Sequence, residues 1–170
     1  MGRGGAPPTA PQAVRPLLSS DPMSESPLHM LVYLSALQPR LTEPELEALV
    51  HDSRTRNTAA GITGVLLHAD GDVIQYLEGP ESAVRATFGR IARDPRHRSI
   101  VVAVDAELPA RVFPRWLMGH LQVTRSQFLA LESADWRAVA SQTGTEPARG
   151  EGTPPGLILL RSFAENARSR

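Results

Sequence analysis

The chain has 170 residues, 41% of them hydrophobic, and its 18 basic residues balance 18 acidic ones. This length supports one hydrophobic core, and the neutral balance gives no electrostatic case for a nucleic-acid or acidic-membrane partner. Because the sequence has no cysteine, disulfides, thiolate catalysis and cysteine-ligated metals are excluded. No apolar run reaches membrane-spanning length, so we expect a cytoplasmic protein.

Two segments are too poor in large apolar residues to form a core. Residues 1–28, rich in Gly, Pro, Ala and Ser, are predicted to be a disordered leader, and residues at about 142–155 are predicted to be a linker. We therefore expect a folded domain over residues 29–125 and a helical extension over residues 126–170 that contains the linker.

A strand and then a helix are predicted at the start of the folded domain. Residues 29–35 form a short apolar run rich in β-forming residues, which is typical of a buried strand. A helix is expected after Thr42, because Thr42 and Glu45 can form a capping box and Pro44 lies in the first turn. This helix should end near Asn57.

A hairpin and a second helix follow. The apolar runs 62–68 and 73–77 are separated by a short segment that contains Asp70-Gly71, the strongest short-range hairpin signal. Apolar residues then recur at helical spacing over 84–91, and this helix should end before Pro95.

The remaining elements complete a fold of the α+β class. Residues 100–104 and 116–123 are strand-like, and weaker helices are predicted within 126–140 and over 155–167. The order favours a ferredoxin-like βαββαβ sheet with an added strand and with both early helices on one face. The last helix carries apolar residues, so we expect the C-terminal helices to cover the other face.

Few residues carry an obvious chemical motif. The five histidines lack metal-ligand spacing, and no phosphate-binding, dinucleotide-binding or nucleophile-elbow motif is present. We therefore predict no metal site and no catalytic residues. Gln75 lies inside an apolar strand, where it must find hydrogen-bond partners or destabilise the fold by a few kcal/mol. Alternation along the strand could also turn it to solvent, and Tyr33 could be an ordinary core aromatic.

Several separate motifs nevertheless occur together and in a recognisable order. They are Leu31-Val32-Tyr33-Leu34-Ser35, Asn57 followed by Gly61-Ile62-Thr63-Gly64, Gly71 followed by Gln75-x-Leu77-Glu78-Gly79, Asp94-Pro95-Arg96-His97, and Trp116-x-Met118. This pattern resembles the BLUF family of flavin-dependent blue-light sensors, and the resemblance spans roughly residues 30–123. Two positions depart from it: Val73 stands where phenylalanine is usual, and Arg56 stands where asparagine or histidine is common.

The resemblance implies that FAD binds non-covalently between the two early helices. Asn57 would pair with the flavin imide edge, Arg96 would donate to the C2 carbonyl, and Asp94 would accept from the ring or the ribityl chain. Arg90 and Arg93 either approach the phosphates or are solvated surface charges. The full set of flavin-binding residues that the resemblance implies is Tyr33, Leu49, Asn57, Gln75, Arg90, Ile91, Asp94, Arg96 and His97.

The resemblance also implies a photoswitch that is not an enzyme active site. Tyr33 would donate an electron, and Gln75 would link its hydroxyl to the flavin and exchange donor for acceptor by rotation or tautomerisation. Strand alternation puts Trp116 and Met118 on one face, so they would compete for the place beside Gln75. Ser35 would pair with the Trp116 region. The signal would pass to an unidentified downstream protein or to self-association of a homo-oligomer.

Two alternatives on the same fold stay open. One is a cofactor-free protein-interaction module that uses the sheet face. The other is an acylphosphatase-like hydrolase, which needs an arginine-bearing phosphate loop after the first strand. Residues 36–40 contain Arg40 but no glycine, which makes such a loop unconvincing.

Overall fold

The computed structural model describes residues 1, 27–38, 41–136 and 154–168. The predicted leader and linker fall almost entirely outside these residues, so both stay predictions. None of the helices within the described ranges is long and apolar enough to cross a membrane.

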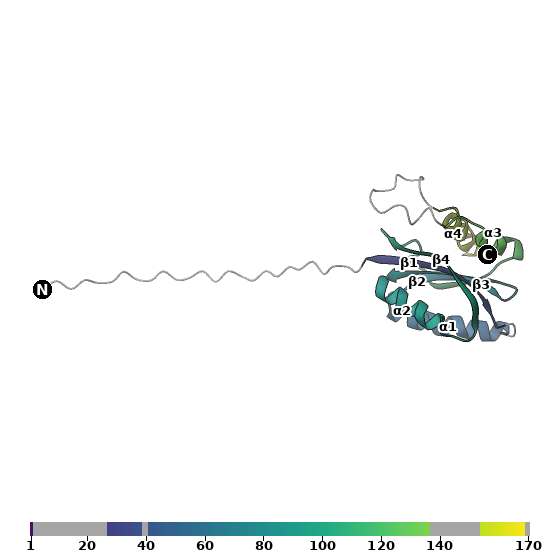
Figure 1. The fold of residues 1–170 in the computed structure, drawn as a ribbon, viewed down its shortest axis with the longest axis horizontal. Coiled ribbons are helices and arrows are strands. Elements are labelled where there is room, and N and C mark those ends of the chain that lie inside the picture. The colour runs from purple at the N-terminus through teal and green to yellow at the C-terminus, as the bar shows by residue number, and fades with distance from the viewer. Residues whose placement is uncertain (2–26, 39–40, 137–153, 169–170) are drawn as a thin grey trace.

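A five-stranded sheet in the order β4-β1-β3-β2-β5 forms the centre of the molecule (Figure 1). Its first strand, β1, pairs antiparallel with β3 and β4, β2 pairs antiparallel with β3, and β5 adds parallel to β2. The predicted ferredoxin-like sheet with an added strand is confirmed. The strands are β1 (Leu28–Leu37), β2 (Thr63–Ala69), β3 (Asp72–Pro80), β4 (His97–Leu108) and β5 (Leu117–Gln122).

The tight turn between β2 and β3 sets their register. Asp70 and Gly71 have φ values of 52° and 91°, the left-handed backbone that a two-residue hairpin turn requires. Asp tolerates this conformation better than most residues, and Gly adopts it freely. The hairpin predicted from Asp70-Gly71 is therefore confirmed.

Helices cover both faces of the sheet (Figure 1). On one face lie α1 (Glu43–Ala59) and α2 (Glu81–Ile91), and on the other lie α3 (Arg125–Glu132) and α4 (Pro155–Arg168). The capping box at Thr42 is present, so the first helix starts where predicted. It ends at Ala59, near the predicted end, and Asn57 lies in its last turn.

The central strands are buried on both faces and divide the core into two clusters. Met30 and Val32 of β1 pack on the α3/α4 side, whereas Leu31 and Tyr33 pack on the α1/α2 side. Side chains alternate along a strand, so this placement fixes which face each residue of β1 contacts. Tyr33 is consequently fully buried beneath α2.

A buried carboxylate ties the segment before β5 to the sheet. Glu78 of β3 is fully buried and accepts hydrogen bonds from the Thr63 hydroxyl at 2.8 Å, the Tyr76 hydroxyl at 2.9 Å, and the backbone N–H groups of Val112 and Phe113 at 2.7 and 2.8 Å. Four donors satisfy a charge that would otherwise be costly to bury. Glu78 therefore positions the chain that enters β5.

Replacement of Glu78 by alanine should destabilise the fold by about 3 kcal/mol or more, because four buried donors lose their acceptor at once. The loss of stability is measured as the difference in the free energy of unfolding in urea between Glu78→Ala and the wild type. Glu107→Ala removes an exposed carboxylate from β4 and should cost less than about 0.5 kcal/mol. Equal losses in the two variants would contradict the positioning role of Glu78.

Candidate functional site

A cleft opens between α1 and α2 above the sheet. Its volume is about 120 Å³, so a larger ligand must widen it or extend from it. The cleft is lined by Leu49, Val50, Ser53, Arg56 and Asn57 of α1, Thr87, Arg90 and Ile91 of α2, Asp94 and Arg96 of the following segment, and Leu66, Gln75, His97 and Met118 of the sheet. The structure thus gathers eight of the nine predicted flavin contacts at one cleft.

The ninth predicted contact, Tyr33, lies directly beneath it. The sheet register sets Tyr33 opposite Gln75, and the Tyr33 hydroxyl donates a hydrogen bond to Gln75 Oε1. Burial, and secondarily the charge of Asp94, raises the pKa of the Tyr33 phenol. The phenol therefore keeps its proton and acts as a donor to Gln75.

The other end of the Gln75 amide is also engaged. Gln75 Nε2 donates to Met118 Sδ at 3.1 Å. A thioether sulfur has no proton and can only accept, so the NH₂ group must face Met118 and the carbonyl must face Tyr33. Only 4% of Gln75 is exposed. The interpretation that Gln75 simply faces solvent is therefore wrong.

The prediction that Trp116 and Met118 share a face is wrong. Met118 packs with Tyr33 on the α1/α2 side, whereas Trp116 packs with the α3/α4 cluster, its ring 6.0 Å from that of Phe113. Strand β5 carries a bulge at this point: Leu117 and Gly119 pair with consecutive residues of β2, and Met118 between them has φ of 89°. The additional residue of a bulge breaks strand alternation.

Ser35 contacts a different residue from the one predicted. Its Oγ is joined to His97 Nδ1 by a hydrogen bond of 2.8 Å. The pairing with the Trp116 region is wrong, because β3 and β2 separate the strand of Ser35 from β5. Burial lowers the pKa of His97, so a neutral imidazole shares this bond. The His97 ring also lies edge-on to Tyr33, with 5.9 Å between centroids.

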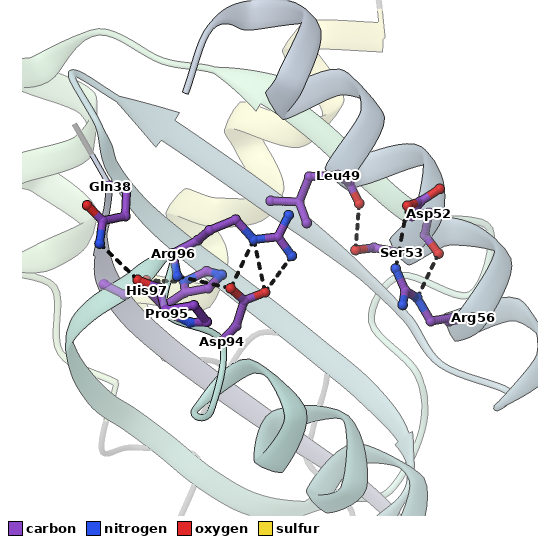
Figure 2. Close-up of polar contacts among 10 residues, drawn as sticks. Gln38, Leu49, Asp52, Ser53, Arg56, Asp94, Pro95, Arg96 and His97 are labelled. Carbon is purple, nitrogen blue, oxygen red and sulfur yellow. Dashed lines mark hydrogen bonds and ion pairs between the residues drawn. The ribbon is translucent and has the colours of Figure 1, made fainter. Parts of the chain in front are cut away.

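Asp94 and Arg96 form a closed pair at the mouth of the cleft (Figure 2). Arg96 Nε donates to the two Asp94 oxygens at 2.9 and 3.1 Å, and Nη2 donates at 2.5 Å. The side-chain hydrogen bonds from Arg96 lower the pKa of Asp94 to about 2. Figure 2 shows Leu49 of α1 pointing across the cleft toward this segment.

The other predicted contacts differ in their hydrogen-bond partners and in whether they line the cleft. Asn57 is 2% exposed and lines the cleft, and its carboxamide has no hydrogen-bond partner among the residues that the structure describes. Arg90 donates to Thr87 Oγ1 at 3.0 Å. Arg56 lines the cleft and donates to the Asp52 carbonyl at 3.2 Å. Arg93 is not among the lining residues.

Four lining residues, Val50, Ser53, Leu66 and Thr87, were not predicted from the sequence as parts of this site, and neither were two neighbours outside the lining. Phe88 of α2 lies 5.5 Å from the Tyr33 ring, centroid to centroid, and Arg54 Nε donates to the Met118 carbonyl at 2.9 Å. Phe88 was identifiable only as an apolar helix position. Arg54 and Met118 are far apart in the sequence, and no local pattern marks their contact.

The Asp94–Arg96 pair predicts an acid-sensitive contribution to stability. The folded-state pKa of Asp94 is lowered, so its carboxylate stabilises the fold above its ordinary pKa of about 4, and this stabilisation is lost as pH falls from about 4 to about 2. The melting temperature of Asp94→Asn should lie below that of the wild type near about pH 6 and converge with it toward about pH 3.

Asp52→Asn provides a matched control, because Asp52 is an exposed carboxylate across the cleft. Near neutral pH, the melting temperature of Asp52→Asn should lie less far below that of the wild type than the melting temperature of Asp94→Asn does. If the difference in melting temperature between Asp94→Asn and the wild type stays constant down to about pH 3, the ion pair is not its cause.

Comparison with known proteins identifies the family. A family model described as sensors of blue-light using FAD, BLUF, matches residues 28–119. Photoactivated adenylate cyclase subunit beta of Euglena gracilis is 37% identical over 90 residues, which make up 53% of this chain and 10% of that protein. The chain thus spans about a tenth of the length of this curated relative.

Solved structures of BLUF proteins also match this chain. The dark-state structure of BlrB, a BLUF protein, is 37% identical with a TM-score of 0.53, and the match covers 63% of this chain and 80% of BlrB. The structure titled BlrP1 BLUF is 31% identical with a TM-score of 0.56, over 83% and 92% of the two chains. These findings support neither the interaction module nor the hydrolase. The chain belongs to the BLUF family of blue-light sensors that use FAD.

Proposed function

We propose that this chain is a photoreceptor that binds FAD non-covalently between α1 and α2 and signals through the hydrogen bonds of Gln75. The observation that carries the proposal is the hydrogen-bonded series on the cleft floor, from the Tyr33 hydroxyl through the Gln75 amide to the Met118 sulfur. Gln75 lies at its centre and also lines the cleft.

The residues of the cleft fit a flavin. A flavin ring has apolar faces and an imide edge, where an N–H lies between two carbonyls. Leu49 and Ile91 give the cleft apolar walls. The Asn57 carboxamide faces the cleft, is without a partner in the described ranges, and offers both a donor and an acceptor.

Arg96 can contact a bound flavin without releasing Asp94. Asp94 occupies Nε and Nη2 of the guanidinium, which leaves the Nη1 hydrogens available to donate to a ring carbonyl. Arg90 lines the α2 side of the cleft and offers a cation for a phosphate. The choice of FAD over FMN rests on the family's description.

When bound, the flavin supplies blue-light absorption and an excited state that accepts an electron from a nearby phenol. Tyr33 is that phenol, and its proton already lies on a hydrogen bond to Gln75 Oε1. Loss of an electron makes a phenol strongly acidic, so the proton moves to Oε1. Return of the electron to Tyr33 and of the proton from Gln75 to the Tyr33 oxygen, after the amide has rotated or changed tautomer, would restore the charges and leave a different hydrogen-bond pattern.

Rotation of the amide has a direct consequence for β5. It would bring Gln75 Oε1 against Met118 Sδ, two atoms that can only accept, so Met118 must move. The Met118 carbonyl is held by Arg54 of α1, which extends the change to that helix. One such bond contributes only ~1 kcal/mol, so the signal needs two nearly balanced arrangements of β5.

The output in this proposal runs from β5 to the C-terminal helices. Helix α4 packs on β5, and Trp116 lies on the α4 side of the sheet. Trp116 therefore does not compete with Met118 for the place beside Gln75. A movement of Met118 would instead shift Trp116 through the bulged backbone that joins them. Ser35 holds His97 in place. The receiver is a downstream protein or a second copy of the chain, and none of these residues performs catalysis on a substrate.

Replacement of Gln75 by leucine should leave flavin bound and abolish the light-induced red shift of its absorption, because the amide that changes its hydrogen bonds is gone. Light-minus-dark spectra of the purified protein measure the shift, and chromatography of the released pigment should identify FAD. A wild-type protein that is colourless when purified and cannot be reconstituted with flavin would refute the proposed function.

Gln122→Leu is the matched control. Gln122 is an exposed amide at the end of β5, so its loss should leave both pigment and red shift at wild-type values. A normal red shift in Gln75→Leu would remove Gln75 from the mechanism.

A further inference from the structure

Three potential metal ligands meet outside the flavin cleft, on the same side of the sheet. They are Glu43 in the first turn of α1, His68 near the end of β2, and His120 in β5, and their ligand atoms all lie within 4.8 Å of one another. In the parallel register, His120 pairs with Leu66, two residues before His68 on the same face. We call these three residues the histidine cluster.

The two imidazoles of the cluster lack hydrogen-bond partners. Their rings are stacked with 4.7 Å between centroids and 11° between planes. Nε2 of His68 and Nε2 of His120 are both buried, and neither has a partner within the described part of the chain. His68 is only 7% exposed. Leaving two buried ring nitrogens unsatisfied is costly, so the arrangement points to a ligand that both nitrogens bind.

We propose that the histidine cluster binds a divalent transition-metal ion of the Zn²⁺ class. Two imidazole nitrogens and one carboxylate oxygen are a donor set that Zn²⁺ prefers. An ordinary imidazole is largely neutral at neutral pH, and its Nε2 lone pair is then available. His120 also lines an exposed hollow beside α1, and water could reach a fourth position from that side once the ligands have moved to bind the ion.

Binding requires a local adjustment. Tetrahedral Zn²⁺ with bonds of about 2.1 Å holds its ligands roughly 3.4 Å apart, so the three groups must move closer together. The imidazole planes must also rotate out of their stack so that both lone pairs converge. Glu43 is exposed in the first turn of α1 and is free to follow. Arg54 is a cation near His120, but it is held by the Met118 carbonyl.

The position of the cluster gives the ion a structural consequence. None of its residues lines the flavin cleft, so flavin and metal do not compete. The ion would fasten the first turn of α1 to β2 and β5. His120 is two residues from Met118, and the site therefore lies on the strand that carries the switching contact.

The test is Zn²⁺ binding to the flavin-loaded protein without an affinity tag, measured by competition with a chromogenic chelator. We expect one ion per chain, with affinity lowered at least about tenfold in His120→Gln and in Glu43→Gln. Glu107→Gln is the matched control for Glu43→Gln, because it removes an exposed carboxylate of β4 outside the cluster. Unchanged binding in His120→Gln, an equal loss in Glu107→Gln, or no binding by the wild type would each overturn the proposal.

Thermal melting separates a lost ligand from a lost fold. Saturating Zn²⁺ should raise the melting temperature of the wild type and of Glu107→Gln by roughly 5–10 °C, because the ion binds only the folded chain. His120→Gln should melt cooperatively without metal and show no such rise. An equal rise in His120→Gln would place the ion elsewhere.

Discussion

The carboxamide of Gln75 is held at both ends by buried side chains. The Met118 sulfur can only accept, so it requires the NH₂ end of the amide to face it, and the Tyr33 hydroxyl then donates to the carbonyl end. Both contacts are buried, so water cannot replace either one. The amide therefore has one satisfied orientation in this structure, and any change in it must be accompanied by a change in its neighbours. This is the property that a switch needs.

The sheet supplies the geometry for that contact. Register pairs Tyr33 with Gln75 directly, whereas the bulge in β5 turns Met118 inward and sends Trp116 to the opposite face. In the proposed mechanism, a movement of Met118 would be transmitted along a backbone that both faces share. The buried Glu78 accepts hydrogen bonds from the backbone of the segment that enters β5 and holds that segment on the sheet.

Much of this architecture could be predicted from local sequence patterns. The Thr42 capping box, the Asp70-Gly71 turn and the apolar run of β1 are all local features, and each predicts its element correctly. Contacts between distant elements were not accessible in this way. Alternation misplaced Trp116 because a bulge leaves no signal in the sequence, and the pairing of His68 with His120 depends on a parallel register that only the folded sheet defines.

Isotope-edited infrared difference spectroscopy tests the central claim most directly. With glutamine side chains labelled, the light-minus-dark spectrum should contain a label-sensitive amide band that disappears in Gln75→Leu. That outcome would mean that the Gln75 carboxamide itself changes its bonding when light is absorbed. A spectrum with a full flavin carbonyl shift but no label-sensitive band would show that the amide is a passive neighbour, and would contradict a switch centred on Gln75.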